Sequence, residues 1–192
     1  MEWGALRLRL SEEGAQRDVV IRLPQSRVFE DVAPRLVDLG GSMAAMVVES
    51  DLSRGARLAL YTGDGLLAAA PFIGQRNRWL APVGAGDLDG DGRIELAYID
   101  RPHLAKTLRV WRYVPGSAEL RAVAARRGLT NHRIGWGYIE GGLRDCGQGL
   151  EMITADAVWG RLMASRLSGG KIESRALGPY GEAALRAAMD CR

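Results

Sequence analysis

The sequence contains very little lysine. Its 26 basic residues include only Lys106 and Lys171, so nearly all are arginine, and they stand against 23 acidic residues. The formal net charge is only +3, and the basic residues do not gather into one block. Nucleic-acid-binding domains concentrate basic side chains on one face or stripe. The composition therefore predicts that nucleic acid is not a partner.

Long apolar runs are also missing. No stretch approaches the roughly 18–20 apolar residues that a membrane-spanning helix needs, so no membrane insertion is expected. The first residues, Met1 to Gly4, are neither basic nor followed by the apolar segment of a secretory signal. As written, the sequence carries no recognisable export or anchoring signal.

Cysteine is scarce. Cys146 and Cys191 are too few for a disulfide scaffold, and they lack the Cys-x-x-Cys spacing of a zinc site. A disulfide between them is possible in an oxidising compartment. It would close a long loop and constrain the unfolded chain by about 3–4 kcal/mol in the chain-entropy model. In a reducing compartment both residues would be small inert hydrophobic side chains.

The easily recognised catalytic motifs are absent as well. The sequence has no Gly-x-Ser-x-Gly elbow, no phosphate-binding P-loop and no His-Glu-x-x-His. His103 and His132 are the only histidines, and both lie in loop-like segments, where a hydrogen-bonded role is favoured over a catalytic pairing. We expect a protein without enzymatic activity.

What the sequence does contain is an internal repeat. Segments 38–48, 87–97 and 145–153 align with one another, with an offset of 49 from Asp38 to Asp87 and of 56 from Glu95 to Glu151. A further acid stands five residues beyond Met46, Glu95 and Glu151, which occupy one aligned position of the three copies. These three acids are Asp51, Asp100 and Asp156.

Each copy is followed by a strand-like segment, a Gly-rich or Pro-Gly turn and a second strand-like segment, which is the pattern of a small antiparallel meander. A period of about 50 residues with about four short strands is typical of propeller-like all-β repeats. We expect one domain over residues 1–192, with units at 1–34 (partial), 35–83, 84–138 and 139–178. Helix is expected only at the C-terminus, over 180–190, where alanine, leucine and arginine favour it.

One loop has the composition of a metal site. Carboxylates stand at its positions 1, 3, 5 and 9, and a glycine at position 6 permits the sharp turn that would fold the loop around an ion. Such hard oxygen ligands suit Ca²⁺, and without a cation they would repel one another. The backbone carbonyl at position 7 completes the expected ligand set, which is Asp87, Asp89, Asp91, Arg93 and Glu95.

An EF-hand is not expected, because its position 12 would be Tyr98 and a strand-like segment follows position 9. The related loops are degraded. The first keeps Asp38 but lacks the later ligands, and the third keeps Asp145 and Glu151 but has Leu143 and Gly147 at the other ligand positions. We expect one strong calcium site, none in the first loop and a weak or absent one in the third.

The Asp-x-Asp-x-Asp-Gly-x-x-Glu segment resembles the FG-GAP and VCBS repeats, which are integrin-α-like β-propeller modules. The resemblance covers roughly residues 5–178, although only 87–99 matches the motif closely. It implies a calcium-stabilised module for interaction or scaffolding in the periplasm or outside the cell, with a protein or a glycan of unknown identity as partner. It also implies a small ring of about four blades, in which the N-terminus begins part-way through a unit, as a truncated or processed chain would.

Two other functions stay open. A carbohydrate-binding or hydrolytic propeller could use the histidines together with Trp79, Trp111, Trp136 and Trp159, although packing between blades is the commoner use of such aromatic residues. An incomplete ring would instead leave a sheet edge exposed and favour an accessory subunit of a larger exported or membrane-associated assembly.

Overall fold

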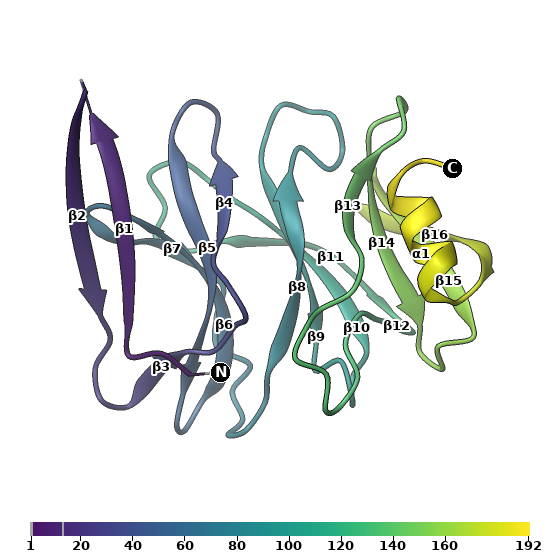
Figure 1. Ribbon diagram of the computed structural model, residues 1–192, viewed down its shortest axis with the longest axis horizontal. Coiled ribbons are helices and arrows are strands. Elements are labelled where there is room, and N and C mark those ends of the chain that lie inside the picture. Colours follow the sequence, from purple (N-terminus) through teal and green to yellow (C-terminus); the bar gives the residue numbers. More distant parts are fainter. Residues whose placement is uncertain (1, 13) are drawn as a thin grey trace.

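The computed structural model describes residues 2–12 and 14–192, and they form antiparallel sheets that stand side by side in a row (Figure 1). The chain begins with the N-terminal hairpin of β1 (Ala5–Glu12) and β2 (Ala15–Arg22), and the three larger sheets that follow are called the first, second and third sheets. The first full sheet contains β4 (Arg35–Asp38), β5 (Met43–Asp51), β6 (Gly55–Thr62) and β7 (Gly65–Ala69), with β3 (Arg27–Phe29) also paired to β5. The expected all-β, propeller-like class is confirmed.

The next two sheets repeat the same meander. The second contains β8 (Leu80–Gly86), β9 (Glu95–Asp100), β10 (Thr107–Arg112) and β11 (Arg121–Arg127). The third contains β13 (Gly142–Asp145), β14 (Leu150–Asp156), β15 (Arg161–Ser168) and β16 (Lys171–Pro179), with β12 (Leu129–Thr130) also paired to β14. The expected C-terminal helix is α1 (Glu182–Met189).

The strand register relates the second and third sheets residue by residue. Glu95 on β9 lies opposite Arg112 on β10, and Glu151, which precedes the Met152–Ser165 pair of β14 and β15, binds Arg166 on β15 at 3.0 Å. In the first sheet an apolar residue, Met46, takes the corresponding position. The arrangement of the strands therefore repeats from sheet to sheet, whereas the charge of the side chain at this position does not.

The central strands are buried on both faces, which is why they read as nearly continuous apolar runs. On β9, Leu96 and Tyr98 pack into a core shared with the first sheet, whereas Ala97 and Ile99 pack into a core shared with the third. Successive side chains of a strand point to opposite faces, so one strand supplies both cores. This stacking fixes how far each sheet stands from the next.

The two outer faces of the row are covered. Leu6, Leu8 and Ile21 of the β1–β2 hairpin pack on the first sheet, and residues of α1, including Ala188, pack on the third. The hairpin and the helix lie at opposite ends of the row in Figure 1, so the sheets form a capped stack rather than a closed ring of blades. Caps of this kind bury the apolar face that a terminal repeat would otherwise expose.

Within the described residues, no helix has the length and apolar character to cross a membrane.

Candidate metal centre

The acidic loop joins the end of β8 to the start of β9, at the upper edge of Figure 1. Asp87 holds its turn: Oδ1 accepts the backbone N–H groups of Gly90 (2.8 Å) and Asp91 (3.0 Å), and Oδ2 accepts that of Gly92 (2.9 Å). Gly90 and Gly92 have φ values of 78° and 81°, a left-handed conformation that other residues rarely adopt. The Asp-Gly spacing thus makes the chain curl around the Asp87 carboxylate.

Three of the predicted ligands converge. Carboxylate oxygens of Asp87, Asp89 and Glu95 lie within 4.8 Å of one another. Glu95 is fully buried, and its Oε2 accepts the N–H of Leu88 at 3.0 Å. Oδ1 of Asp89 is buried and has no hydrogen-bond partner among the described residues. A buried carboxylate oxygen without a donor is costly, so this atom is suited to bind a cation.

The other two predicted ligands take different places. Asp91 lies outside this group of three and directs Oδ2 toward Arg112. Arg93 enters the loop through its backbone N–H, which donates to Asp91 Oδ1 at 3.0 Å. Arg93 and Asp91 therefore close the second half of the turn.

Arg112 is the component that the motif did not indicate. It reaches the loop from β10, and its Nη2 lies 2.7 Å from Asp89 Oδ2 while its Nη1 lies 2.9 Å from Asp91 Oδ2. Its Nε donates to Glu95 Oε1. The loop thus has an internal counter-ion, but one guanidinium balances only part of the charge of four carboxylates.

The pKa shifts follow from this balance. Burial raises the pKa of Glu95 above its ordinary value, although the Leu88 N–H and Arg112 oppose the shift. At Asp91 burial also opposes ionisation, but the Arg93 N–H and the Arg112 charge outweigh it and lower the pKa. A further positive charge nearby would therefore favour the ionised form of the buried Glu95.

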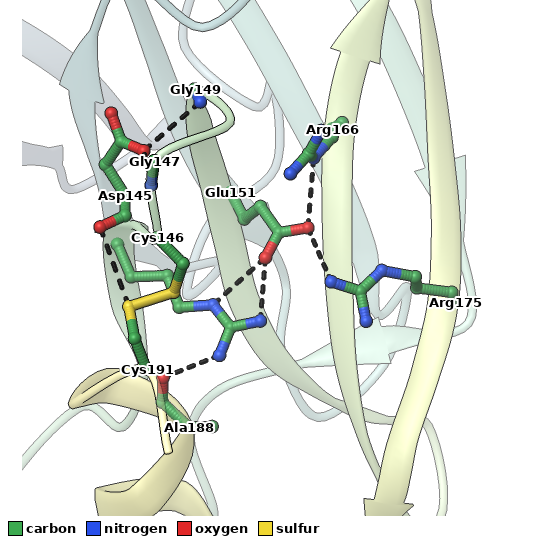
Figure 2. Close-up of a disulfide and its surroundings, with 10 residues drawn as sticks. Asp145, Cys146, Gly147, Gly149, Glu151, Arg166, Arg175, Ala188 and Cys191 are labelled. Carbon is green, nitrogen blue, oxygen red and sulfur yellow. Dashed lines mark hydrogen bonds and ion pairs between the residues drawn. A yellow bond between two sulfur atoms is a disulfide. The ribbon is translucent and has the colours of Figure 1, made fainter.

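In the third sheet arginines surround the glutamate that aligns with Glu95. Glu151, which is 2% exposed, binds Arg144, Arg166 and Arg175 at 2.7–3.0 Å (Figure 2). Burial opposes ionisation of this carboxyl, but the three arginines outweigh it and lower its pKa. Arg144 also donates to the carbonyl of Ala188 at 2.6 Å and so ties α1 to the sheet.

The alignment of the third loop needs a correction. Arg144 lies opposite Glu151 just as Gly86 lies opposite Glu95, so Asp145 corresponds to Asp87 and not to Asp89. Asp145 Oδ1 accepts the N–H groups of Gly147 and Gly149 in the same type of turn (Figure 2). The third loop is two residues shorter than the second. An alignment with a constant offset from Glu95 to Glu151 therefore placed Asp145 two positions too late, at Asp89 instead of Asp87.

The first sheet moves its buried acid along the strand. Glu49 on β5 is fully buried and binds Arg27 at 3.0 Å and Arg57 at 2.7 Å, and it accepts the hydroxyl of Tyr61 at 3.0 Å. Asp38 opens a turn like that of Asp87 by accepting the N–H groups of Gly40 and Gly41. Each full sheet therefore has a buried glutamate with an arginine on the next strand.

Cys146 and Cys191 form a disulfide with an S–S distance of 2.00 Å. The bond joins the Asp145 loop to Cys191, two positions beyond the end of α1, beside the Glu151 cluster (Figure 2). It holds the helix against the outer face of the third sheet.

The aromatic residues divide into two sets. Trp111 packs in the core beside the first sheet and donates from Nε1 to the Tyr98 hydroxyl at 3.2 Å. Trp79 contacts His132, and Trp136 and Trp159 contact each other, in loops at the opposite end of β8 from Asp87.

Compared with known proteins, the chain matches no family model and no curated sequence.

Proposed function

We propose that this protein is a non-catalytic interaction or structural module of the FG-GAP and VCBS type that binds one calcium ion in the loop 87–95. The observation that carries the proposal is the convergence of Asp87, Asp89 and Glu95 together with the unpartnered, buried Oδ1 of Asp89. These oxygen donors are of the kind that calcium prefers. Calcium would supply the positive charge that Arg112 alone does not.

The expected role of calcium is structural. Asp87 follows the last residue of β8 and Glu95 is the first residue of β9, so an ion held by both joins two neighbouring strands. β8 also packs against strands of the first and third sheets. A ligand that binds only the native state stabilises it by mass action.

The disulfide supports an exported location, in the periplasm or outside the cell, because structural disulfides persist in oxidising compartments. The proposed absence of catalysis rests on the buried glutamates. Glu49, Glu95 and Glu151 are each bound to arginine, which leaves them as structural charges rather than as an acid–base pair.

Calcium titration of the protein stripped with EDTA tests the proposal, with magnesium as the comparison ion. Extracellular calcium modules bind with Kd values of about 0.1–1 mM. At 100 times the Kd, calcium should stabilise the protein by about 2.7 kcal/mol, which raises the Tm by about 5–10 °C for a chain of this size. Isothermal titration calorimetry should show one site.

The decisive variant is Asp89→Asn, which keeps the side-chain shape and removes the charge that faces the site. Asp38→Asn is the matched control, since it alters the same type of turn in another sheet. Asp89→Asn should abolish the calcium-dependent rise in Tm, whereas Asp38→Asn should retain it. A wild-type protein indifferent to calcium, or an undiminished response in Asp89→Asn, would refute the proposal.

A further inference from the structure

A pocket of about 340 Å³ lies at the end of the sheets opposite the acidic loop. Its lining includes Glu30, Asp31, Trp79, His103, His132 and Trp136. Glu30 and Asp31 lie between β3 and β4 of the first sheet, His103 lies between β9 and β10 of the second, and His132 and Trp136 precede β13 of the third. The pocket is therefore composite, since loops associated with all three sheets contribute to it.

The walls are held by hydrogen bonds within the protein. Trp79 Nε1 donates to the carbonyl of Glu30 at 2.9 Å, and Asp31 Oδ1 accepts the N–H of Val32 at 2.7 Å. His132 Nδ1 lies 2.8 Å from the carbonyl of Tyr138, which can only accept, so Nδ1 carries the proton. In the tautomer with this proton, Nε2 is the ring atom that can accept a hydrogen bond from a ligand. A ligand would thus enter a site that is already organised.

Several polar atoms of the pocket are left for a ligand. Glu30 Oε2 accepts the hydroxyl of Ser50, while Oε1 has no hydrogen bond within the described part of the chain. The ring of His103 lies 5.2 Å from that of His132, centroid to centroid. Burial, and then the nearby His132 and Lys106, lower the pKa of His103 and so favour its neutral ring, which offers one donor and one acceptor.

Aromatic rings supply the apolar part. Trp79 and His132 meet edge to face at 5.1 Å between centroids. The rings of Trp136 and Tyr138 stack with their centroids 4.7 Å apart, and the guanidinium of Arg133 lies 5.1 Å from the centroid of the Trp136 ring. Both indoles are half-buried, so they are braced by the protein and still reach the pocket. Flat, fixed rings beside donors and acceptors present one apolar and one polar surface.

We propose that this pocket binds a neutral sugar unit. One face of a pyranose ring is lined with C–H groups that pack on an indole, and its hydroxyls both donate and accept, as Glu30, His103 and His132 require. The volume lies at the small end of the range for ligand pockets, about 300–1,000 Å³, which suits one or two sugar rings. The inference goes beyond the calcium proposal and uses none of the calcium ligands.

The charges of the site favour a neutral ligand over an ion. The carboxylates of Glu30 and Asp31 oppose an anion. An organic cation would meet the positive charges of Arg133, which lies beside Trp136, and of Lys106, which acts on His103. Asp31 is in addition bound to Arg35 at 2.5 Å. A polyhydroxylated neutral molecule faces neither form of repulsion.

The test is a titration of the whole chain with glucose, galactose, mannose and N-acetylglucosamine, followed by tryptophan fluorescence and calorimetry. Tetramethylammonium and acetate serve as the charged comparison probes. We expect saturable binding of at least one sugar with a Kd of about 1 mM or lower. Absence of saturation with every sugar, or saturation with a charged probe alone, would overturn the proposal.

Two pairs of variants locate the site. Trp79→Phe and Glu30→Gln should each weaken sugar binding at least about tenfold. Their controls, Trp111→Phe in the core and Glu173→Gln on exposed β16, should not weaken it. Circular dichroism checks that every variant is folded. Equal affinities in the variants and their controls would show that the sugar binds elsewhere and would refute the assignment.

The same titration in EDTA separates this proposal from the calcium site. Trp79 precedes β8 and Asp87 follows it, so the seven residues of the strand hold them about 20 Å apart. Sugar binding should therefore persist without calcium, even if the calcium proposal itself fails. Loss of binding in EDTA would mean that a metal holds the sugar, and would overturn the pocket assignment.

Discussion

Arg112 lies directly opposite Glu95 across the β9–β10 pair, and its guanidinium joins that buried carboxylate to Asp89 and Asp91. A single side chain from the neighbouring strand therefore binds three carboxylates of the acidic loop, although the sequence motif of that loop does not include it. The pairing makes the stability of the second sheet depend on a balance between an internal cation and the proposed bound one.

Replacing Arg112 tests this balance. In Arg112→Gln the buried Glu95 loses its charged partner, and removing one member of a buried ion pair costs about 3–5 kcal/mol. Because the loop becomes more negative, calcium should bind at least about tenfold more tightly and restore part of the lost stability. Urea denaturation with and without calcium measures both effects.

The matched control is Arg166→Gln, which removes one of the arginines that bind Glu151. Glu151 keeps Arg144 and Arg175, so we expect a smaller loss, of about 1–2 kcal/mol, and no gain in calcium affinity. Equal losses in the two variants, with calcium binding unchanged in both, would show that Arg112 does not act as a counter-ion in competition with calcium.

The Glu151 cluster predicts an acid-sensitive contribution to stability. Its pKa is lower in the folded protein than the ordinary value of 4.5, so its stabilising effect is present above that pH and is lost as the pH falls through the folded pKa. Glu151→Gln should be less stable than wild type near pH 7, and the difference should shrink as the pH falls below 4.5 and through the folded-state pKa. Thermal unfolding across this range provides the measurement. The exposed Glu173→Gln should track wild type throughout, and a Glu151→Gln deficit that is constant with pH would contradict the prediction.

Reduction of the disulfide should loosen the C-terminal cap. Opening the bond between Cys146 and Cys191 should cost about 3–4 kcal/mol by the chain-entropy account, with the first effect on α1. Urea denaturation with and without dithiothreitol measures the loss, and hydrogen exchange over 182–189 locates it. The double serine variant should already show the loss and ignore the reductant. If thiol titration finds two free thiols while stability is unchanged, the bond is dispensable.

The N-terminal hairpin should be required as a cap. Leu6 is 6% exposed and packs in the cluster that contains Phe29, Val47 and Tyr61 of the first sheet. Leu6→Ala should cost about 2–5 kcal/mol and promote aggregation through the uncovered face. Leu36→Ala is the control, because Leu36 is 76% exposed and surface changes are usually within about 0.5 kcal/mol. Denaturant midpoints and light scattering distinguish the two, and similar behaviour would argue against a capping role.

Local pattern was sufficient for the strands and for the turn of the acidic loop. The period of about 50 residues, with strand-like segments joined by turns, predicted the all-β class, because each copy supplies the strands of one meander. The Asp87-to-Gly92 spacing predicted the turn because Asp87 binds the backbone of residues three to five positions away. Such contacts depend only on neighbours in the chain.

The partners across strands and sheets were decided by the tertiary structure. Arg112 is 17 residues from Glu95, and the three arginines of Glu151 come from three strands, so no motif along the chain contains them. The hairpin and α1 pack on the two outer sheet faces, so both ends of the row of sheets are capped. The sequence by itself determined the elements and the Asp87 turn, which arise from local backbone and side-chain geometry. Only the fold decided which charges meet, since register and stacking bring together residues that are distant along the chain.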